Sequence, residues 1–247
     1  MAEGRDPFAS SGMAIFGITS ASGGLGVSTL TCALGAAVVR QGGTAVVVDG
    51  TVMHGGLHVT AGVEHEPGYR WRDLVEVDGP VDGERLLGHL PVAAGVAVLS
   101  AGRATGAPDG VLDEDVPPAA FTGVVRSLGR VCDLVVIDWG RSWPLAGVGE
   151  AWLIVAGLSP SGLADVAAAV RHREVAGCAG VVTRGRRPDS GLAAALAGHV
   201  GLPLLGELAD DRTVARAVER GDLPGERSRG PLARVADALA TALVEAV

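Results

Sequence analysis

The feature that most constrains the fold is an alternation of short apolar runs with longer segments of helical spacing. Seven runs are apolar at consecutive positions and mostly rich in β-branched residues, which indicates strands buried on both faces of a sheet. They are Ala14–Thr19, Thr44–Val48, Val96–Ser100, Leu134–Ile137, Trp152–Ala156, Ala179–Thr183 and Pro203–Leu208. Strands of this kind need a covering layer on each side, and the segments between them must supply it.

Those intervening segments carry apolar residues three and four positions apart, as helices do. The sets are Leu30, Leu34, Ala37 and Val38; Phe121, Val124, Val125 and Leu128; Leu163, Val166 and Val170; and Val214, Ala217 and Val218. The alternation predicts an α/β fold, a doubly wound, mostly parallel sheet of about seven strands with helices on both faces. In such a sheet, ligands bind beyond the carboxyl ends of the strands.

Length and composition are those of a single large domain. The chain has 247 residues, 48% of them hydrophobic, and we expect a flexible tail over residues 1–12 and one domain over residues 13–247. No apolar run reaches the roughly 18 residues of a membrane span, and the first residues lack a signal-peptide pattern. We therefore expect a cytoplasmic protein without a membrane helix. A net charge of −8 argues against DNA as a partner, because non-specific DNA binding needs a basic surface.

A glycine-rich loop joins the first predicted strand to the first predicted helix. It reads Ser22-Gly23-Gly24-Leu25-Gly26-Val27-Ser28-Thr29. Glycines let the backbone approach an anion closely, and successive N–H groups at a helix N-terminus bind phosphate. All the residues from Gly23 to Thr29 are therefore candidate nucleotide-binding residues.

This loop resembles the deviant Walker A motif of the ParA/MinD superfamily, in which one lysine precedes the two glycines and another follows the third. Ser22 and Val27 occupy those positions here, and every one of the 20 basic residues in the chain is an arginine. In the superfamily, the first lysine contacts the nucleotide of the partner subunit and the second neutralises the β- and γ-phosphates. The resemblance implies a phosphate loop that has lost both lysines, and the flat fork of an arginine does not reproduce an ammonium group.

Two acidic segments match the superfamily in the same order. Val46–Thr51 resembles the strand that ends in Asp-x-Asp, with Asp49 present and Thr51 in place of the acid that helps to orient the attacking water. Asp133–Asp138 resembles the Walker B strand.

The resemblance implies ATP or ADP with Mg²⁺ as the ligand. It places Ser28 on the metal ion, Asp138 on the ion through a water molecule, Asp49 in the nucleotide site and Arg184 near the adenine.

The match extends over roughly residues 15–221, and Gly55–His58 and Gly68–Leu74 look most similar to the CpaE/TadZ-like branch, including actinobacterial septum-site-determining (Ssd) proteins. It implies a homodimer that is recruited to a cell pole or septum by proteins of pilus, secretion or division machinery.

Because two lysines and an acid are missing, we expect little or no ATPase activity. We interpret the chain as a degenerate ATP-binding localisation or scaffold factor for Tad-type pilus or secretion machinery or for septum placement; the alternative is an active ATPase switch that cycles between monomer and dimer.

Other patterns have simpler interpretations. Gly24 and Gly26 with Asp49 about 20 residues on suggest a dinucleotide site, but Thr29 stands where that motif needs a third glycine. Trp139 and Trp143, directly after the Walker B-like strand, are expected to pack in the core; the alternative is that they fill space near the nucleotide or a dimer partner. The segment Pro231–Val247 has helical spacing with only one basic residue, which predicts a terminal helix docked on the core rather than on a membrane.

Overall fold

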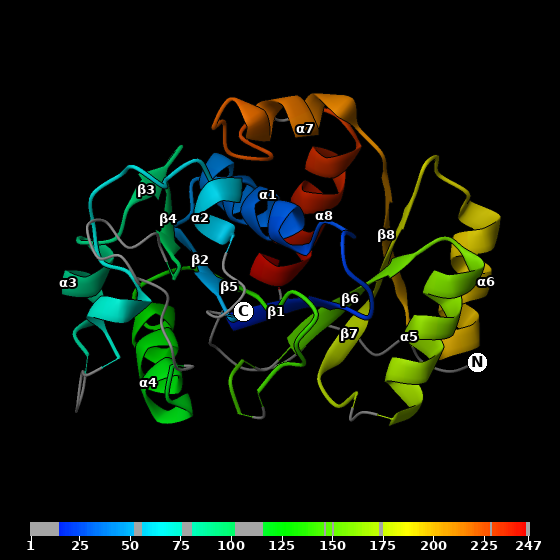
Figure 1. Ribbon diagram of the computed structural model, residues 1–247, viewed down its shortest axis with the longest axis horizontal. Helices are drawn as coiled ribbons and strands as arrows, with labels where there is room; N and C mark the ends of the chain where they lie inside the picture. Colours follow the sequence, from blue (N-terminus) through cyan, green and yellow to red (C-terminus); the bar gives the residue numbers. More distant parts are fainter. Residues whose placement is uncertain are drawn as a thin grey trace, which may run out of the picture.

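The protein forms one eight-stranded sheet with the strand order β3-β4-β2-β5-β1-β6-β7-β8 (Figure 1). The computed structural model describes residues 15–51, 56–75, 81–101, 116–145, 147–149, 151–172, 175–227 and 229–245, so the predicted tail over residues 1–12 lies outside the described residues. The strands are β1 (Ile15–Ser20), β2 (Ala45–Asp49), β3 (Val92–Ala93), β4 (Val96–Leu99), β5 (Leu134–Asp138), β6 (Ala151–Gly157), β7 (Cys178–Gly185) and β8 (Leu204–Ala209).

Each of the seven predicted runs forms a strand, and the neighbouring pairs among them are parallel. The eighth strand, β3, is two residues long and pairs antiparallel with β4 at the edge of the sheet. The predicted doubly wound, mostly parallel sheet is therefore confirmed. A two-residue strand was not predicted because it is too short to show a pattern.

The helical segments are α1 (Val27–Arg40), α2 (Leu57–Thr60), η2 (Trp71–Asp73), α3 (Gly83–Leu87), α4 (Pro118–Gly129), α5 (Pro160–His172), α6 (Ser190–Val200), α7 (Arg212–Glu219) and α8 (Pro231–Glu245). Sequence spacing predicted α1, α4, α5, α7 and α8 but not α6 or the short segments α2, η2 and α3. Helix α6 reads SGLAAALAGHV, in which small apolar residues occur all round the helix, so that no apolar stripe stands out.

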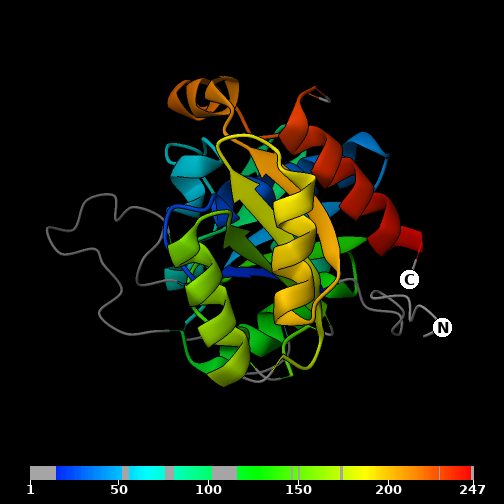
Figure 2. The same ribbon diagram turned by 90° about the vertical axis from the view of Figure 1, so that its right-hand side faces the viewer.

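Helices cover both faces of the sheet. Alternate residues of the central strand β5 belong to two separate cores: Leu134 and Val136 face α1 and α8, whereas Val135 and Ile137 face α4. Figure 1 shows α1 and α8 on one side of the sheet and α4 on the other, and Figure 2 shows α5 and α6 side by side. A third core lies between these last two helices and strands β6 and β7.

The terminal helix docks on the core, as predicted. Leu232, Leu239 and Leu243 of α8 are buried, and an ion pair between Arg40 and Asp237 joins α8 to α1. None of the helices in the described part of the chain is long and apolar enough to cross a membrane.

Of the two tryptophans after β5, Trp139 lies in the core, as predicted, and Trp143 packs against the edge of the core. Trp139 is 2% exposed and lies against Gly17 and Gly50, where an added Cβ would come within 2.8 Å and 2.7 Å of its ring. Trp143 is partly buried and packs edge-on against Trp152, with ring centroids 4.9 Å apart.

Candidate functional site

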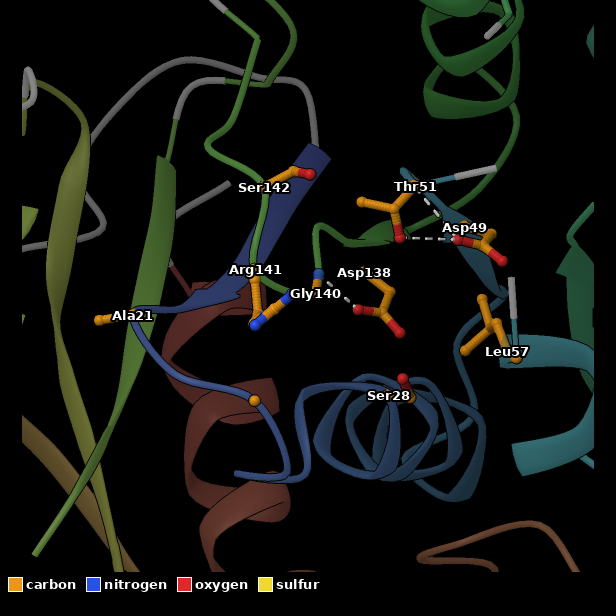
Figure 3. A pocket seen from close by; sticks show the side chains of 11 residues that line it. Ala21, Ser28, Asp49, Thr51, Leu57, Asp138, Gly140, Arg141 and Ser142 are labelled. Atoms are coloured by element: carbon orange, nitrogen blue, oxygen red, sulfur yellow. Dashed lines mark hydrogen bonds between the residues drawn. The ribbon is translucent and has the colours of Figure 1, made fainter. Parts of the chain in front are cut away.

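A cavity of about 540 Å³, here called the first cavity, opens beyond the carboxyl ends of β1, β2 and β5. In Figure 3 the side chains of Ser28, Asp49 and Asp138 gather on one side of it. The lining residues are Ala21, Gly23, Ser28, Asp49, Thr51, Gly56, Leu57, Asp138, Gly140, Arg141 and Ser142. The sheet topology therefore brings the glycine loop and both predicted acids to one place.

The glycine loop borders this cavity through Gly23 and Ser28. Gly24 and Gly26 have φ values of 75° and 82°, in the left-handed region that other residues avoid. Gly26 is the N-cap of α1, no side chain caps the helix, and its first turn holds no acidic residue. The first N–H groups of α1 are thus free to bind an anion, which the helix dipole also favours.

Two buried carboxylates lie on adjacent strands at the base of the first cavity. Asp49 and Asp138 are 2% and 3% exposed and are paired in register between β2 and β5. Burial, followed by the negative charge of Asp138, raises the pKa of Asp49 from 3.8 to about 7, although the N–H groups of Thr51 and Leu57 offset part of this effect. Burial also raises the pKa of Asp138, against hydrogen bonds from the Ser28 hydroxyl and the Gly140 N–H. Both acids are therefore poised to take up either a proton or a cation.

The oxygen atoms at this place suit Mg²⁺. Asp49 Oδ2 is buried and accepts no hydrogen bond from the described residues, and the Ser28 hydroxyl already contacts Asp138. The part of the chain that the structure describes holds no group of three or more His, Cys, Asp or Glu residues able to bind a metal. This donor set fits Mg²⁺ better than an ion that needs a full protein cage, because Mg²⁺ commonly uses one or two carboxylates together with phosphate oxygens and water.

Thr51 occupies the position where the resemblance places a second acid. Its N–H donates to Asp49 Oδ1 at 3.1 Å, and its hydroxyl lies 3.4 Å from the same oxygen. The dashed lines in Figure 3 show this arrangement. A neutral hydroxyl engaged with Asp49 is a weak substitute for a carboxylate that would orient a water molecule.

The second cavity, of about 320 Å³, adjoins the start of α1. Gly26, Thr29 and Arg184 line it together with residues of β8 and α7 and with Leu232. Arg184 forms an ion pair with Asp210 at 3.2 Å, and an added Cβ on Gly26 would lie 2.5 Å from its guanidinium. Arg184 therefore lies directly beside the glycine loop.

The structure thus divides the predicted site residues between two cavities. Gly23, Ser28, Asp49 and Asp138 line the first cavity, and Gly26, Thr29 and Arg184 line the second. Three predicted residues line neither: Gly24 lies in open space with its left-handed backbone, Leu25 packs against the core, and Val27 is 6% exposed in the core. Val27 stands where the resemblance places the phosphate-binding lysine, and its side chain is directed away from the cavity into the apolar core.

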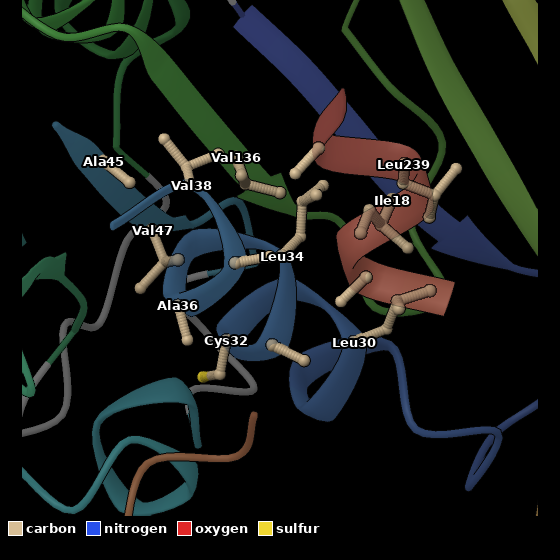
Figure 4. Close-up of a cluster of buried hydrophobic side chains, with 14 of the residues drawn as sticks. Ile18, Leu30, Cys32, Leu34, Ala36, Val38, Ala45, Val47, Val136 and Leu239 are labelled. Carbon is tan, nitrogen blue, oxygen red and sulfur yellow. The ribbon is translucent and has the colours of Figure 1, made fainter. Parts of the chain in front are cut away.

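The helix that carries the glycine loop is anchored in the main core. Leu30, Leu34 and Val38 of α1 are almost fully buried, and they pack with Val136 of β5 and Leu239 of α8. Figure 4 shows these side chains converging between α1, the sheet and α8. This packing fixes the N-terminus of α1 relative to the ends of the strands.

Sequence reasoning missed Arg141 and Ser142, which line the first cavity. They follow Asp138 by three and four residues, at the carboxyl end of a central strand. The rule that ligands bind beyond the carboxyl ends of parallel strands was the signal that pointed to this loop.

Comparisons with known proteins agree with this architecture. No family model matches the chain. The Uncharacterized protein Rv3660c of Mycobacterium tuberculosis (strain H37Rv) is 29% identical over 221 residues, 85% of this chain, and this chain spans 58% of that protein's length.

Two solved structures are similar in fold. The ParA family ATPase from Chlorobium tepidum superposes with a TM-score of 0.75 at 16% identity, covering 93% of this chain and 99% of that one. The septum site-determining protein MinD of Pyrococcus horikoshii, complexed with Mg-ADP, superposes with a TM-score of 0.65 at 20% identity, covering 92% and 94% of the two chains. The glycine loop, the two acids at the strand ends and these superpositions together show that the chain has the ParA/MinD type of P-loop NTPase fold.

Proposed function

We propose that this chain binds ATP or ADP with Mg²⁺ and hydrolyses ATP little or not at all. The observation that carries the proposal is the first cavity, in which two buried acids and Ser28 face a glycine loop that has no lysine. A fold neighbour that is complexed with Mg-ADP supports the choice of ligand.

Each part of the site has a role in holding the nucleotide. The loop N–H groups and the N-terminus of α1 bind the phosphates, since they are uncapped and lie in backbone conformations that only glycine adopts easily. Ser28 and Asp138 hold the Mg²⁺, Asp138 through a water molecule, and the buried charge of Asp49 adds to the attraction for the ion. The bound ion would neutralise phosphate charge.

The second cavity is the place for the base. It adjoins Gly26 and Thr29 at the start of α1, so a nucleotide whose phosphates lie in the first cavity can extend across the glycine loop into it. Arg184 lines this cavity beside Leu208 and Val218, which offer an apolar surface to a flat ring. We therefore retain Arg184 as an adenine-side residue.

Weak hydrolysis follows from what the site lacks. The side chain at the lysine position, Val27, is buried in the core, and the hydroxyl of Thr51 lies beside Asp49. Removing a single charged or hydrogen-bonding group that stabilises developing charge costs about two to three orders of magnitude in rate. With the water-orienting acid also missing, we expect bound ATP to persist.

A protein that binds a nucleotide without hydrolysing it is suited to a localisation or scaffold role. From the sequence resemblance to the CpaE/TadZ-like and Ssd branch, we assign it to the positioning of Tad-type pilus or secretion machinery or of the septum, as a homodimer that binds protein partners. Two proteins of similar fold, a ParA family ATPase and a septum site-determining protein, support this class of role.

Isothermal titration calorimetry with ATP, with and without Mg²⁺, tests the binding proposal. We expect one nucleotide per chain and a requirement for Mg²⁺. Ser28→Ala should weaken Mg²⁺-dependent binding by about tenfold, because it removes one oxygen ligand and one hydrogen bond to Asp138. Ser161→Ala, an exposed serine of α5, is the matched control and should bind as the wild type does. No heat of binding from the folded wild-type protein would refute the proposed function.

A further inference from the structure

Arg141 is the one basic residue among the described residues that line the first cavity. It comes from the loop after β5, not from the glycine loop. In Figure 3 its side chain extends from that loop toward the glycine loop. The cavity therefore contains a positive charge, although the chain has no lysine.

The Arg141 side chain lies over the first glycine of the loop. A Cβ added to Gly23 would stand 3.6 Å from Arg141 Cδ and 3.9 Å from Nη1, which is van der Waals contact. The guanidinium is thus close to the N–H groups that would bind a phosphate. A larger residue at position 23 would come between the loop and this side chain.

The backbone on both sides of Arg141 is fixed to the end of β1. The Gly140 carbonyl accepts hydrogen bonds from the N–H and hydroxyl of Ser20, at 2.9 Å and 3.0 Å. The Ser142 carbonyl accepts one from the Thr19 hydroxyl at 2.6 Å. Because β1 leads directly into the glycine loop, these hydrogen bonds fix the backbone of Arg141 next to that loop.

Arg141 has no acidic partner among the described residues. The ion pairs in that part of the chain involve Arg40, Arg72, Arg184 and Arg220. Asp138 shares the cavity, but its Oδ1 accepts the Gly140 N–H at 2.9 Å, and the Ser28 hydroxyl also bonds this carboxylate. An exposed guanidinium without a carboxylate, next to uncapped backbone N–H groups, is available to an anion from solution.

We propose that Arg141 supplies the phosphate-binding positive charge that the glycine loop lacks, and that it contacts the terminal phosphate of the bound nucleotide. This inference rests on the proposed function, because it concerns the same ligand. A guanidinium presents parallel N–H donors that match two oxygens of a phosphate. The charge reaches the phosphate from the β5 side of the cavity, whereas Val27 in the loop cannot provide it.

The test compares nucleotide affinity in Arg141→Gln with the wild-type protein by calorimetry in the presence of Mg²⁺. Losing a charge-assisted hydrogen-bonded pair should weaken ATP binding by about 10- to 100-fold. The loss should be smaller for ADP and smallest for AMP, because the terminal phosphates are the ones contacted. Arg130→Gln, which changes an exposed arginine after α4 that lines neither the first nor the second cavity, is the matched control and should bind ATP as the wild type does.

Thermal unfolding of each variant checks that it is folded, and Arg141→Lys adds a second comparison that should retain more ATP affinity than Arg141→Gln. ATP affinity that is the same in Arg141→Gln and the wild type would overturn this inference while leaving the proposed function in place. An equal loss for ATP, ADP and AMP would also overturn it. Absence of ATP binding to the wild type would overturn both.

Discussion

At the level of single residues, the surroundings of Asp49 and Asp138 destabilise the ionised form of each carboxyl group. They lie in register on neighbouring strands, both nearly fully buried, and the charge of Asp138 adds to the effect of burial on Asp49. Burying two carboxyl groups side by side costs electrostatic free energy, whereas apolar residues at the same positions would cost none. A bound cation would offset this cost, so the pair is consistent with a cation site.

The raised pKa of Asp49 makes the stability of the nucleotide-free protein depend on pH. The folded carboxyl, with a pKa of about 7 against an ordinary value of 3.8, holds its proton more tightly than the unfolded one. Protonation therefore favours the folded state, and the free energy of unfolding should fall as pH rises from about 4 to 7. The Asp49 contribution is on the order of 2–4 kcal/mol.

Urea denaturation of wild type and Asp49→Asn between pH 5 and pH 8, in EDTA, measures this effect. The wild type should lose stability relative to Asp49→Asn as the pH rises, because the amide does not ionise. Parallel pH profiles for the two proteins would show that Asp49 does not titrate in this range.

Gly17 is a second residue whose identity the packing requires. A methyl group there would lie 2.8 Å from the Trp139 ring and 3.1 Å from Trp152 Cβ, in a fully packed core. Gly17→Ala should destabilise the protein by about 1–3 kcal/mol. Gly123→Ala is the control, because a Cβ at this α4 position meets nothing within 4 Å, and it should stabilise by up to about 1 kcal/mol. Equal melting temperatures for the two variants would contradict this account of Trp139 packing.

At the level of elements, the sequence predicted what has a repeating pattern and missed what does not. The seven longer strands and helix α1 have continuous apolar runs or clear helical spacing, and they lie where they were predicted. Strand β3 is too short for a pattern, and α6 is apolar on all sides. Strand β3 forms by pairing with β4, and α6 forms by burying Ala193, Leu196 and Ala197; both depend on contacts of the folded chain.

The site residues, too, were predictable where they belong to a sequence motif and not elsewhere. The glycine loop and the acids at the strand ends have motifs, so their proximity was predictable once the sheet was assumed to be parallel. Arg141 belongs to a loop without a motif of its own, and its position over Gly23 depends on hydrogen bonds from the end of β1 to the backbone of Gly140 and Ser142. Only the folded backbone shows that contact.

Helix α8 packs against α1, the helix that begins at the glycine loop. Leu239 is 2% exposed and packs in the same core as Leu34 of α1. Leu239→Ala should destabilise the protein by about 2–5 kcal/mol through the cavity that it leaves. Arg234→Ala, at an exposed position of the same helix, should change the stability by no more than about 0.5 kcal/mol. Similar chemical denaturation midpoints for both variants would show that α8 is not a structural part of the core.

In the whole molecule, both cavities border one glycine loop, at the carboxyl edge of a single sheet. The first cavity has acids, a serine and Arg141, and the second cavity has Arg184 and apolar residues. The same arrangement lacks an acid at position 51 and has a buried valine at the lysine position. These features are the basis for the proposal that the protein binds a nucleotide but hydrolyses it little or not at all.

The most direct test of this account is the rate of phosphate release from ATP by purified protein, at an ATP concentration where calorimetry shows the site to be saturated with Mg²⁺ present. The account predicts bound ATP and no steady release above that of an Asp138→Ala control. Steady release of phosphate by the wild type, abolished in Asp138→Ala, would contradict it and would identify the protein as a working ATPase.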